Sequence, residues 1–160
     1  MGMRGHLCAV SPATLQDLQR IRNETRTLSG APAASGTAPQ GLELEKSWHT
    51  LHYLLAGTVY EPGPAPGDAI LGGREIGPDL GYGPARYLSP DQVRATAAAL
   101  AQLTPAELAR RFDLKTMREA DIYCCEDESG LALAQDYFVE LADYYQKAAA
   151  RGDAMLLAIL

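Results

Sequence analysis

The segment from Leu71 to Asp91 constrains the fold more than any other part of this chain, because it holds five glycines and three prolines. Glycine allows positive φ angles and close approach of the backbone, whereas proline fixes φ and stops a helix. The segment also carries apolar side chains that can anchor it to a core, namely Leu71, Ile76, Leu80, Tyr82 and Leu88. We therefore expect an ordered loop at the centre of a small domain.

Length and composition predict one cytoplasmic domain that spans residues 1–160. The chain is 47% hydrophobic and 21% charged, which is ordinary for a globular protein. Its net charge of −6 argues against nucleic acid or an anionic membrane as the main partner. It has no apolar run of about 18 residues that could span a membrane. Three cysteines do not make a disulfide framework, so we expect reduced, structural thiols.

The N-terminal part of the chain predicts a strand, a helix and a mobile loop. The apolar run His6–Val10 is typical of a buried strand. Ser11 and Pro12 form the start signal of a helix that we expect to reach about Arg22. Residues 28–41 are small, polar and rich in glycine and proline. They cannot bury enough apolar area to offset the entropy of ordering, so we expect a mobile loop there.

Residues 42–56 predict a second helix. Four large apolar side chains recur with helical spacing, namely Leu44, Trp48, Leu51 and Leu55. Gly57 suits the position just after the C-terminus of the helix. On this helix His52 should lie beside the apolar stripe, and His49 should lie further round, towards solvent. Residues 69–71 then predict a short strand that leads into the glycine-rich segment.

The second half of the chain predicts four helices and a final strand. Ser89-Pro90-Asp91-Gln92 and Thr104-Pro105-Ala106-Glu107 are capping boxes with proline at the first helical position. Asp113 is expected to cap a short third helix, and residues 131–151 form a long fourth one that buries Ala134, Phe138, Leu141, Tyr145 and Ala148. Residues 154–160 form an apolar run of strand length, and the obvious partner of that strand is His6–Val10.

These elements predict an α+β fold. We expect a small sheet of three or four short strands that includes the N- and C-terminal strands, with helices packed on it. The sequence contains no internal repeat.

Four motifs stand out along the chain, and they are Met1-Gly-Met-Arg-Gly, Trp48-His49-x-x-His52-Tyr53-Leu-Leu-Ala-Gly57, Leu71-Gly-Gly and Asp79-Leu-Gly-Tyr-Gly-Pro-Ala-Arg-Tyr87-Leu-Ser-Pro. In these motifs the chain resembles the YfbM-like family of small bacterial proteins. The resemblance covers the chain from its first residue to its closing strand, and it implies a single α/β-type domain in the bacterial cytoplasm. It implies no reaction, because the function of the family is unknown. Cys124-Cys125 departs from the apolar or aromatic residues expected at this point.

His49 and His52 lie three residues apart on the predicted helix, so both imidazoles can point the same way. With a third ligand they could hold a metal ion, but the motif supplies none, so we expect no metal. The alternative is a half-buried His52 packed near Trp48, with His49 at the rim. The sequence also lacks the phosphate-binding, zinc-protease and serine-hydrolase motifs, and we expect no cofactor.

Arg86 follows a Gly-Tyr-Gly-Pro turn, and two roles are open for its guanidinium. It could grip a carboxylate or phosphate of a ligand in bidentate fashion. It could instead form an internal ion pair with Asp79 or Glu75 that fixes the segment, and we favour this second role. The same arginine could serve both purposes if its internal partner leaves part of it unsatisfied.

Two functions from different classes follow. The first is a non-catalytic binding or protein-interaction module, of which an immunity-type or regulatory protein is one version. The second is a small enzyme that acts on an anionic small molecule, with a histidine as acid or base and Arg86 as the clamp. Either would use a pocket or surface formed by Trp48, His49, His52, Asp79, Tyr82 and Arg86. We favour the first, because the sequence supplies no set of nucleophile, base and orienting residue.

Overall fold

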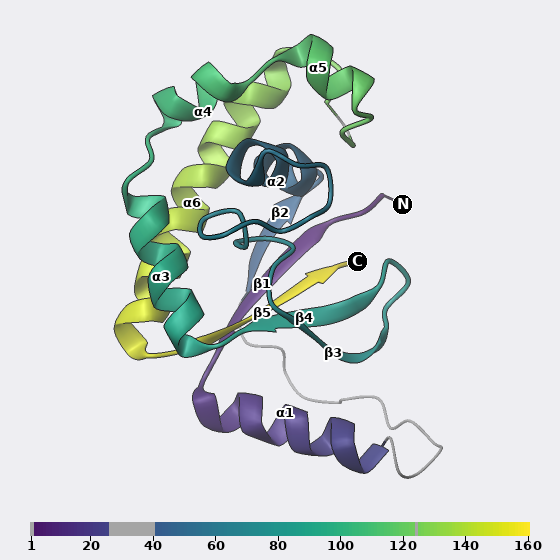
Figure 1. Ribbon diagram of the computed structural model, residues 1–160, viewed down its shortest axis with the longest axis vertical. Coiled ribbons are helices and arrows are strands. Elements are labelled where there is room, and N and C mark those ends of the chain that lie inside the picture. The colour runs from purple at the N-terminus through teal and green to yellow at the C-terminus, as the bar shows by residue number, and fades with distance from the viewer. Residues whose placement is uncertain (1, 26–40, 124) are drawn as a thin grey trace.

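The computed structural model describes residues 2–25, 41–123 and 125–160, and folds them into a five-stranded sheet with helices on both faces (Figure 1). Every pair of neighbouring strands is antiparallel, and the strand order is β2-β1-β5-β4-β3. The elements are β1 (Gly5–Val10), α1 (Pro12–Thr25), β2 (Leu42–Glu45), α2 (Trp48–Ala56), β3 (Arg74–Asp79), β4 (Pro84–Leu88), α3 (Pro90–Ala101), α4 (Pro105–Arg111), α5 (Leu114–Glu119), α6 (Ser129–Arg151) and β5 (Ala154–Ile159).

The two terminal strands pair with each other, as the apolar runs at both ends predict. β1 and β5 are in antiparallel register from the pair Gly5–Ile159 to the pair Val10–Ala154. Two further backbone hydrogen bonds, of 2.7 and 2.9 Å, join Arg4 and Leu160 beyond the last strand pair. β5 lies in the middle of the sheet, with β1 on one side and β4 on the other. The predicted α+β fold is confirmed, although the sheet has one strand more than the upper expectation.

The helix expected over residues 42–56 is wrong in its first third. Leu42–Glu45 is strand β2, paired with β1, and helix α2 begins at Trp48. Leu44 is fully buried while its neighbours Glu43 and Glu45 are not, which is the period-two pattern of a strand. Leu44 and Trp48 are four residues apart by coincidence, and this spacing imitates a helical stripe. At the other end the expectation holds, because Gly57 has φ of +74° and donates its N–H to the carbonyl of Tyr53.

The strand expected at residues 69–71 is also wrong, since these residues belong to a run of turns. Backbone hydrogen bonds join Gly67 to Pro64 and Gly72 to Asp68, so the chain coils instead of extending. Ala69 and Ile70 are buried all the same. The hydroxyl of Tyr145 donates a 2.7 Å hydrogen bond to the carbonyl of Ala69, which satisfies a backbone acceptor that no strand partner reaches.

The glycine-rich segment forms the β3–β4 hairpin, at one edge of the sheet and not at its centre. Its turn is organised by Asp79, whose carboxylate accepts the N–H groups of Gly81 at 2.6 Å and Gly83 at 3.1 Å. Both glycines have positive φ angles, which an L side chain would strain. Hydrogen bonds of the backbone order the segment, because its two strands pair with each other and β4 also pairs with β5.

The helices divide unequally between the two faces of the sheet (Figure 1). The main core lies under α2, α3, α4 and α6 on one face, and α1 covers the other with a smaller core around Leu15 and Ile76. Both predicted capping boxes are present, and Asp113 caps α5 through the N–H of Thr116. The predicted stripe of α6 is buried at Ala134, Phe138, Leu141, Tyr145 and Ala148. The mobile loop expected at residues 28–41 falls almost wholly outside the described residues.

Candidate functional site

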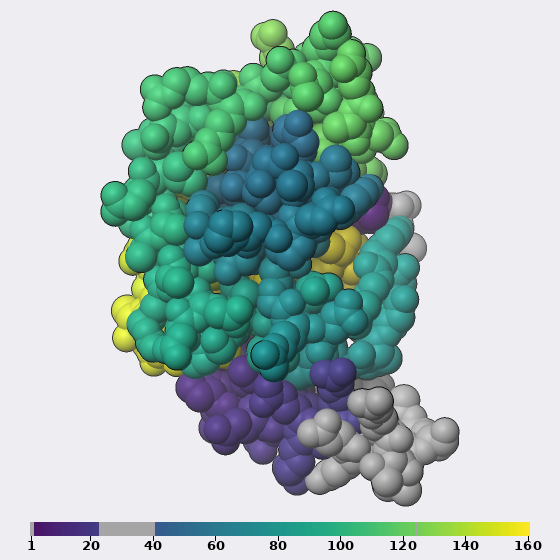
Figure 2. All heavy atoms as spheres, viewed as in Figure 1, coloured from purple at the N-terminus to yellow at the C-terminus, as the bar shows by residue number. Residues whose placement is uncertain are grey.

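A hollow of about 220 Å³ lies above the C-terminal end of β5. In Figure 2 the yellow atoms of this strand show between the blue-teal segment that follows α2 and the teal β3–β4 hairpin. The hollow forms on the face that carries the larger helical layer, at a place where α2 has already ended at Gly57. The lining residues come from three stretches of chain, and they are Tyr60, Pro62, Ile70, Leu71, Glu75, Tyr82, Gly83, Pro84, Arg86, Leu157, Ala158 and Ile159.

Two exposed tyrosines line this hollow from opposite stretches of chain. Tyr60 is 61% exposed and follows α2, and Tyr82 is 55% exposed and lies in the turn of the hairpin. The ring of Tyr60 is fixed on its inner side, because it stacks on the ring of the buried His49. Large exposed aromatic side chains beside a concave surface are typical of binding sites, since they bury much area and lose little rotamer entropy.

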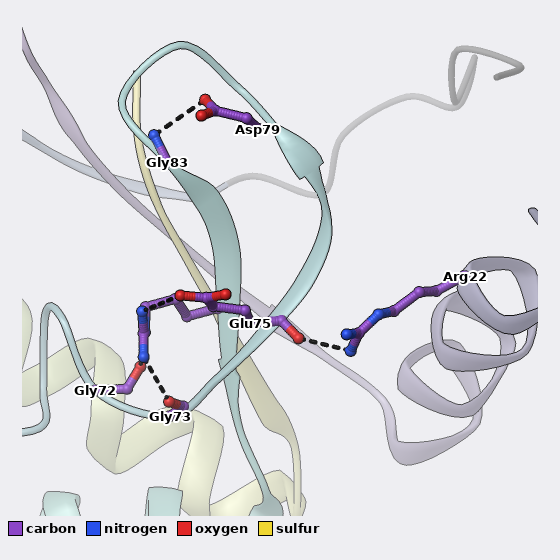
Figure 3. A network of polar contacts seen from close by, with 7 residues as sticks. Arg22, Gly72, Gly73, Glu75, Asp79 and Gly83 are labelled. Carbon is purple, nitrogen blue, oxygen red and sulfur yellow. Dashed lines mark hydrogen bonds and ion pairs between the residues drawn. The ribbon is translucent and has the colours of Figure 1, made fainter. Parts of the chain in front are cut away.

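Arg86 lies on β4 and is tied to the chain that enters the hairpin (Figure 3). Its Nε donates to the carbonyl of Gly72 at 3.3 Å, and its Nη2 donates to the carbonyl of Gly73 at 3.1 Å. Its Nη1 lies 3.1 Å from a carboxylate oxygen of Glu75. The internal ion pair expected for Arg86 therefore exists with Glu75. Of the two partners considered, Asp79 is the wrong one, because its carboxylate binds the hairpin turn.

Gly72 and Gly73 are required for this arrangement. A Cβ on Gly73 would lie 2.1 Å from the carbonyl oxygen of Tyr87, and the residue has φ of +80°. A Cβ on Gly72 would lie 2.3 Å from the carbonyl oxygen of Asp68. Only glycine permits both approaches. The Leu71-Gly-Gly motif thus places two consecutive carbonyl oxygens under the guanidinium of Arg86.

One carbonyl on the edge strand β3 is bound by a side chain of α1. Arg22 of α1 donates a 2.8 Å hydrogen bond from Nη1 to the carbonyl of Glu75 (Figure 3). Further along β3, Pro78 has no N–H group, and the pairing with β4 shifts register between Ile76 and Asp79. These features protect an edge strand from pairing with another chain. The hollow on the sheet face is therefore a better candidate for a binding site than the edge of the strand.

His49 is buried, at 1% exposure, so the expectation that it points towards solvent is wrong. Its Nδ1 accepts the backbone N–H of Tyr123 at 2.9 Å, and its Nε2 lies 2.9 Å from the carbonyl of Val59. The first bond requires an unprotonated Nδ1, so Nε2 carries the proton and donates it to Val59. The ring also stacks between Trp48 at 4.6 Å and Tyr60 at 5.0 Å. Burial lowers the pKa of His49, which keeps the imidazole neutral.

His52 is also buried, at 1% exposure. Neither of its ring nitrogens, nor the indole nitrogen of Trp48, has a hydrogen-bond partner among the described residues. Burial, followed by the neighbouring His49, lowers the pKa of His52 to about 4. The backbone and carboxylate of Glu61 oppose this shift, but no hydrogen bond of normal geometry reaches the ring. His52 is therefore an apolar-like core side chain at neutral pH.

The predicted site residues are split by the fold. Tyr82 and Arg86 line the hollow together, whereas Trp48, His49 and His52 lie in the interior below it, and Asp79 braces the hairpin turn. Tyr60 connects the two groups, because it lines the hollow and stacks on His49. Sequence reasoning missed Tyr60 and the end of β5. Tyr60 follows the predicted helix without any motif, and β5 reaches the hollow only because it is the central strand.

Other candidate groups in the described part of the chain offer less chemistry. Burial raises the pKa of the thiols of Cys8 and Cys125, so neither is an activated nucleophile, and Cys124 lies outside the described residues. No three histidine, cysteine or carboxylate side chains of the described residues come together in a way that could hold a metal ion. Among the described helices, none has the length and apolar character needed to cross a bilayer.

Comparisons with known proteins agree with the fold and leave the function open. The model of one family, described as a domain of unknown function (DUF1877), matches residues 1–158. Among solved structures, a protein of unknown function, YfbM from Escherichia coli, is similar with a TM-score of 0.72 and 23% sequence identity, over 98% of this chain and 99% of that one. No curated protein matches. The resemblance to YfbM-like proteins is confirmed, and the chain belongs to the DUF1877 family, a domain of unknown function.

Proposed function

We infer that this protein is a non-catalytic binding module that recognises a partner protein through the hollow above β5. The observation that carries this inference is the pair of exposed rings, Tyr60 and Tyr82, on two sides of one concave surface. Leu80, in the turn of the same hairpin as Tyr82, is another exposed apolar side chain, at 45%. Binding surfaces commonly combine aromatic anchors with a central depression and a polar rim.

The contacts of the two histidines favour a binding module over an enzyme. Acid or base catalysis needs an imidazole that can reach a ligand. His49 uses both ring nitrogens inside the protein, and His52 is buried with a depressed pKa. Neither lines the hollow that contains Arg86. An enzyme built on His49 or His52 with Arg86 as the clamp would need the segment around Tyr60 to move away first.

Site-specific photo-cross-linking tests the proposed surface. A photoreactive amino acid replaces Tyr82 in one variant and Val139 in a matched control, because Val139 is equally exposed, at 56%, on α6. We expect a discrete adduct with a protein of the source cells from position 82, none from position 139, and a weaker adduct when Tyr60→Ser is added. Identical adducts from the two positions, or an adduct from position 139 alone, would contradict the proposal.

A further inference from the structure

We propose that the hollow above β5 binds a carboxylate joined to a small apolar group, and that Arg86 receives this carboxylate in exchange for Glu75. The inference rests on the proposed function, because it assigns a ligand chemistry to the same hollow. The carboxylate belongs to the group that enters the hollow, either a part of the partner protein or a free small acid. The contacts proposed above for Tyr60 and Tyr82 are unchanged.

Two of the three contacts that hold the guanidinium are with the backbone. Nε and Nη2 of Arg86 donate to the consecutive carbonyl oxygens of Gly72 and Gly73. Neither glycine tolerates a Cβ at its position, so these acceptors are fixed by the shape of the chain. The plane of the guanidinium therefore stays fixed when its third partner leaves. Such preorganisation lowers the entropic cost of binding a ligand.

Arg86 keeps hydrogen-bonding capacity for a ligand. A guanidinium has five N–H groups, and three of them donate to the Gly72, Gly73 and Glu75 acceptors within the described residues. The side chain is 32% exposed and lines the hollow. A carboxylate that takes the place of Glu75 on Nη1 can also accept the second N–H of Nη2. This gives two parallel, charge-assisted bonds, where Glu75 makes one.

Glu75 is the exchangeable partner. Its side chain is 58% exposed on an edge strand, and its contact with Arg86 is a single hydrogen bond of 3.1 Å. Ion pairs this exposed contribute little, because water solvates both charges well when they separate. The backbone of Glu75 is held independently, by Arg22 and by β4. The side chain can therefore swing out without disturbing the strand.

The remaining lining of the hollow suits an apolar group next to the carboxylate. Leu71 and Ile159, which are partly exposed, supply aliphatic surface, and the exposed rings of Tyr60 and Tyr82 line the same hollow. At about 220 Å³ the space admits a single side chain, not a folded element. A bare inorganic anion would leave this apolar surface wet. An acid with an apolar group would cover it and gain the hydrophobic contribution of the buried area.

The net charge of −6 does not oppose this assignment. Charges of the protein surface are screened beyond roughly 8 Å at physiological ionic strength. The guanidinium in the hollow is the charge in direct contact with the ligand. The overall negative charge should slow the encounter with an anion, which is an effect on rate more than on affinity.

An NMR titration with a matched pair of probes tests the proposal. N-acetyl-L-leucine and N-acetyl-L-leucinamide share the apolar group and differ in the carboxylate. We expect the acid to shift the Nε–H resonance of Arg86 and the ring resonances of Tyr60 and Tyr82, with at least about tenfold weaker binding of the amide. N-acetyl-L-leucine stands for the C-terminal end of a chain, and phenylacetate, titrated in parallel, stands for a free small acid. Binding of either acid more tightly than the amide supports the proposal, and the acid that binds more tightly indicates the source of the carboxylate.

Two variants separate exchange at Arg86 from simple attraction. Glu75→Gln removes the competing charge, so it should tighten binding of the acid by about threefold to fivefold. Glu61→Gln removes the same charge from an exposed residue of the neighbouring segment and should change binding by less than about twofold. Arg86→Lys should reduce the preference for the acid over the amide, because an ammonium keeps the charge but cannot bind two oxygens in parallel.

The inference is overturned if the acid and the amide bind equally, if neither binds, or if Glu75→Gln weakens binding of the acid. Its failure differs from failure of the proposed function. Cross-linking at position 82 without any preference for the acid leaves a partner surface whose central contact is not a carboxylate. Binding of the acid without a cross-linked partner leaves a small-acid site in place of a protein-interaction module.

Discussion

The ring of Tyr60 stacks on the ring of His49, with 5.0 Å between the centroids and 25° between the planes. Tyr60 is exposed and lines the hollow, whereas His49 is buried and joins α2 to the backbone of Val59 and Tyr123. A surface ring of the candidate site is thus positioned by a hydrogen-bonded imidazole in the core. A change at His49 should reach the hollow through Tyr60, although His49 does not line it.

Replacement of the two histidines by leucine should have unequal effects on stability. His49→Leu leaves the N–H of Tyr123 and the carbonyl of Val59 without their partner, so we expect a loss of about 2 to 4 kcal/mol in the free energy of unfolding. His52→Leu removes a buried imidazole that has no partner among the described residues, so we expect a change within about 1 kcal/mol. Urea unfolding of both variants measures the difference, and equal losses would show that the hydrogen bonds of His49 do not matter.

The depressed pKa of His52 should make stability depend on pH in the mildly acidic range. Its pKa falls from 6.5 in the unfolded chain to about 4 in the folded protein, so the unfolded chain binds more protons between these values. The stabilisation is complete above pH 6.5 and is lost as the pH falls towards 4. Between pH 6.5 and 5 the expected loss is about 1.5 kcal/mol, because the full slope of about 1.4 kcal/mol per pH unit is reached only once the imidazole of the unfolded chain is mostly protonated.

The variant His52→Leu isolates this contribution. Its unfolding free energy should fall less than that of the natural protein between pH 6.5 and 5, where most carboxylates are still ionised. The pKa of His49 is also lowered, so a smaller slope in the same direction should remain. A pH profile that His52→Leu leaves unchanged would mean that His52 is not the residue that titrates.

Arg86→Lys should destabilise the hairpin more than the same change at a surface ion pair. Lysine cannot bond the carbonyls of Gly72 and Gly73 and the carboxylate of Glu75 in the same geometry, so we expect a loss of about 1 to 3 kcal/mol. Arg94, which pairs with Asp91 on the surface of α3, is the matched control. Arg94→Lys should cost less than about 0.5 kcal/mol. Thermal or urea unfolding compares them, and similar losses would argue against a bracing role for Arg86.

Local signals in the sequence predict the helices well, because those signals act within one turn. Both capping boxes need only a hydroxyl and a carboxylate or amide three residues apart, and both form as expected. Strand β2 shows the opposite case. Residues Leu42–Glu45 fit a helical stripe and a strand equally well, and the pairing with β1 decides between them. That decision depends on a contact between segments far apart in the sequence, which periodicity cannot show.

The candidate site also combines contacts between residues close in the sequence with contacts between residues far apart in it. The internal ion pair of Arg86 is predicted with Asp79 or Glu75 as its partner, and the strand register, which places Glu75 directly across the hairpin, decides between them. The position of His49 is not, because its burial depends on Val59 and on Tyr123, whose backbone arrives from a turn after α5. The hollow itself needs the end of β5, which reaches it only through the strand order. The sequence thus identifies Tyr82 and Arg86 as lining residues and cannot place the histidines relative to them.

Gly73→Ala should be far more damaging than Gly57→Ala, although both glycines have φ near +75° to +80°. An alanine at either position pays the strain of a left-handed conformation, about 1 to 2 kcal/mol. At Gly57 a Cβ meets nothing within 4 Å, so strain is the whole effect. At Gly73 a Cβ would lie 2.1 Å from the carbonyl oxygen of Tyr87, and the carbonyl under Arg86 would have to move. We expect a loss of more than about 3 kcal/mol for Gly73→Ala by urea unfolding, together with a shift of the Arg86 Nε–H resonance that Gly57→Ala does not cause. Equal losses would place the cost in φ alone and would remove the steric reason for the Leu71-Gly-Gly motif.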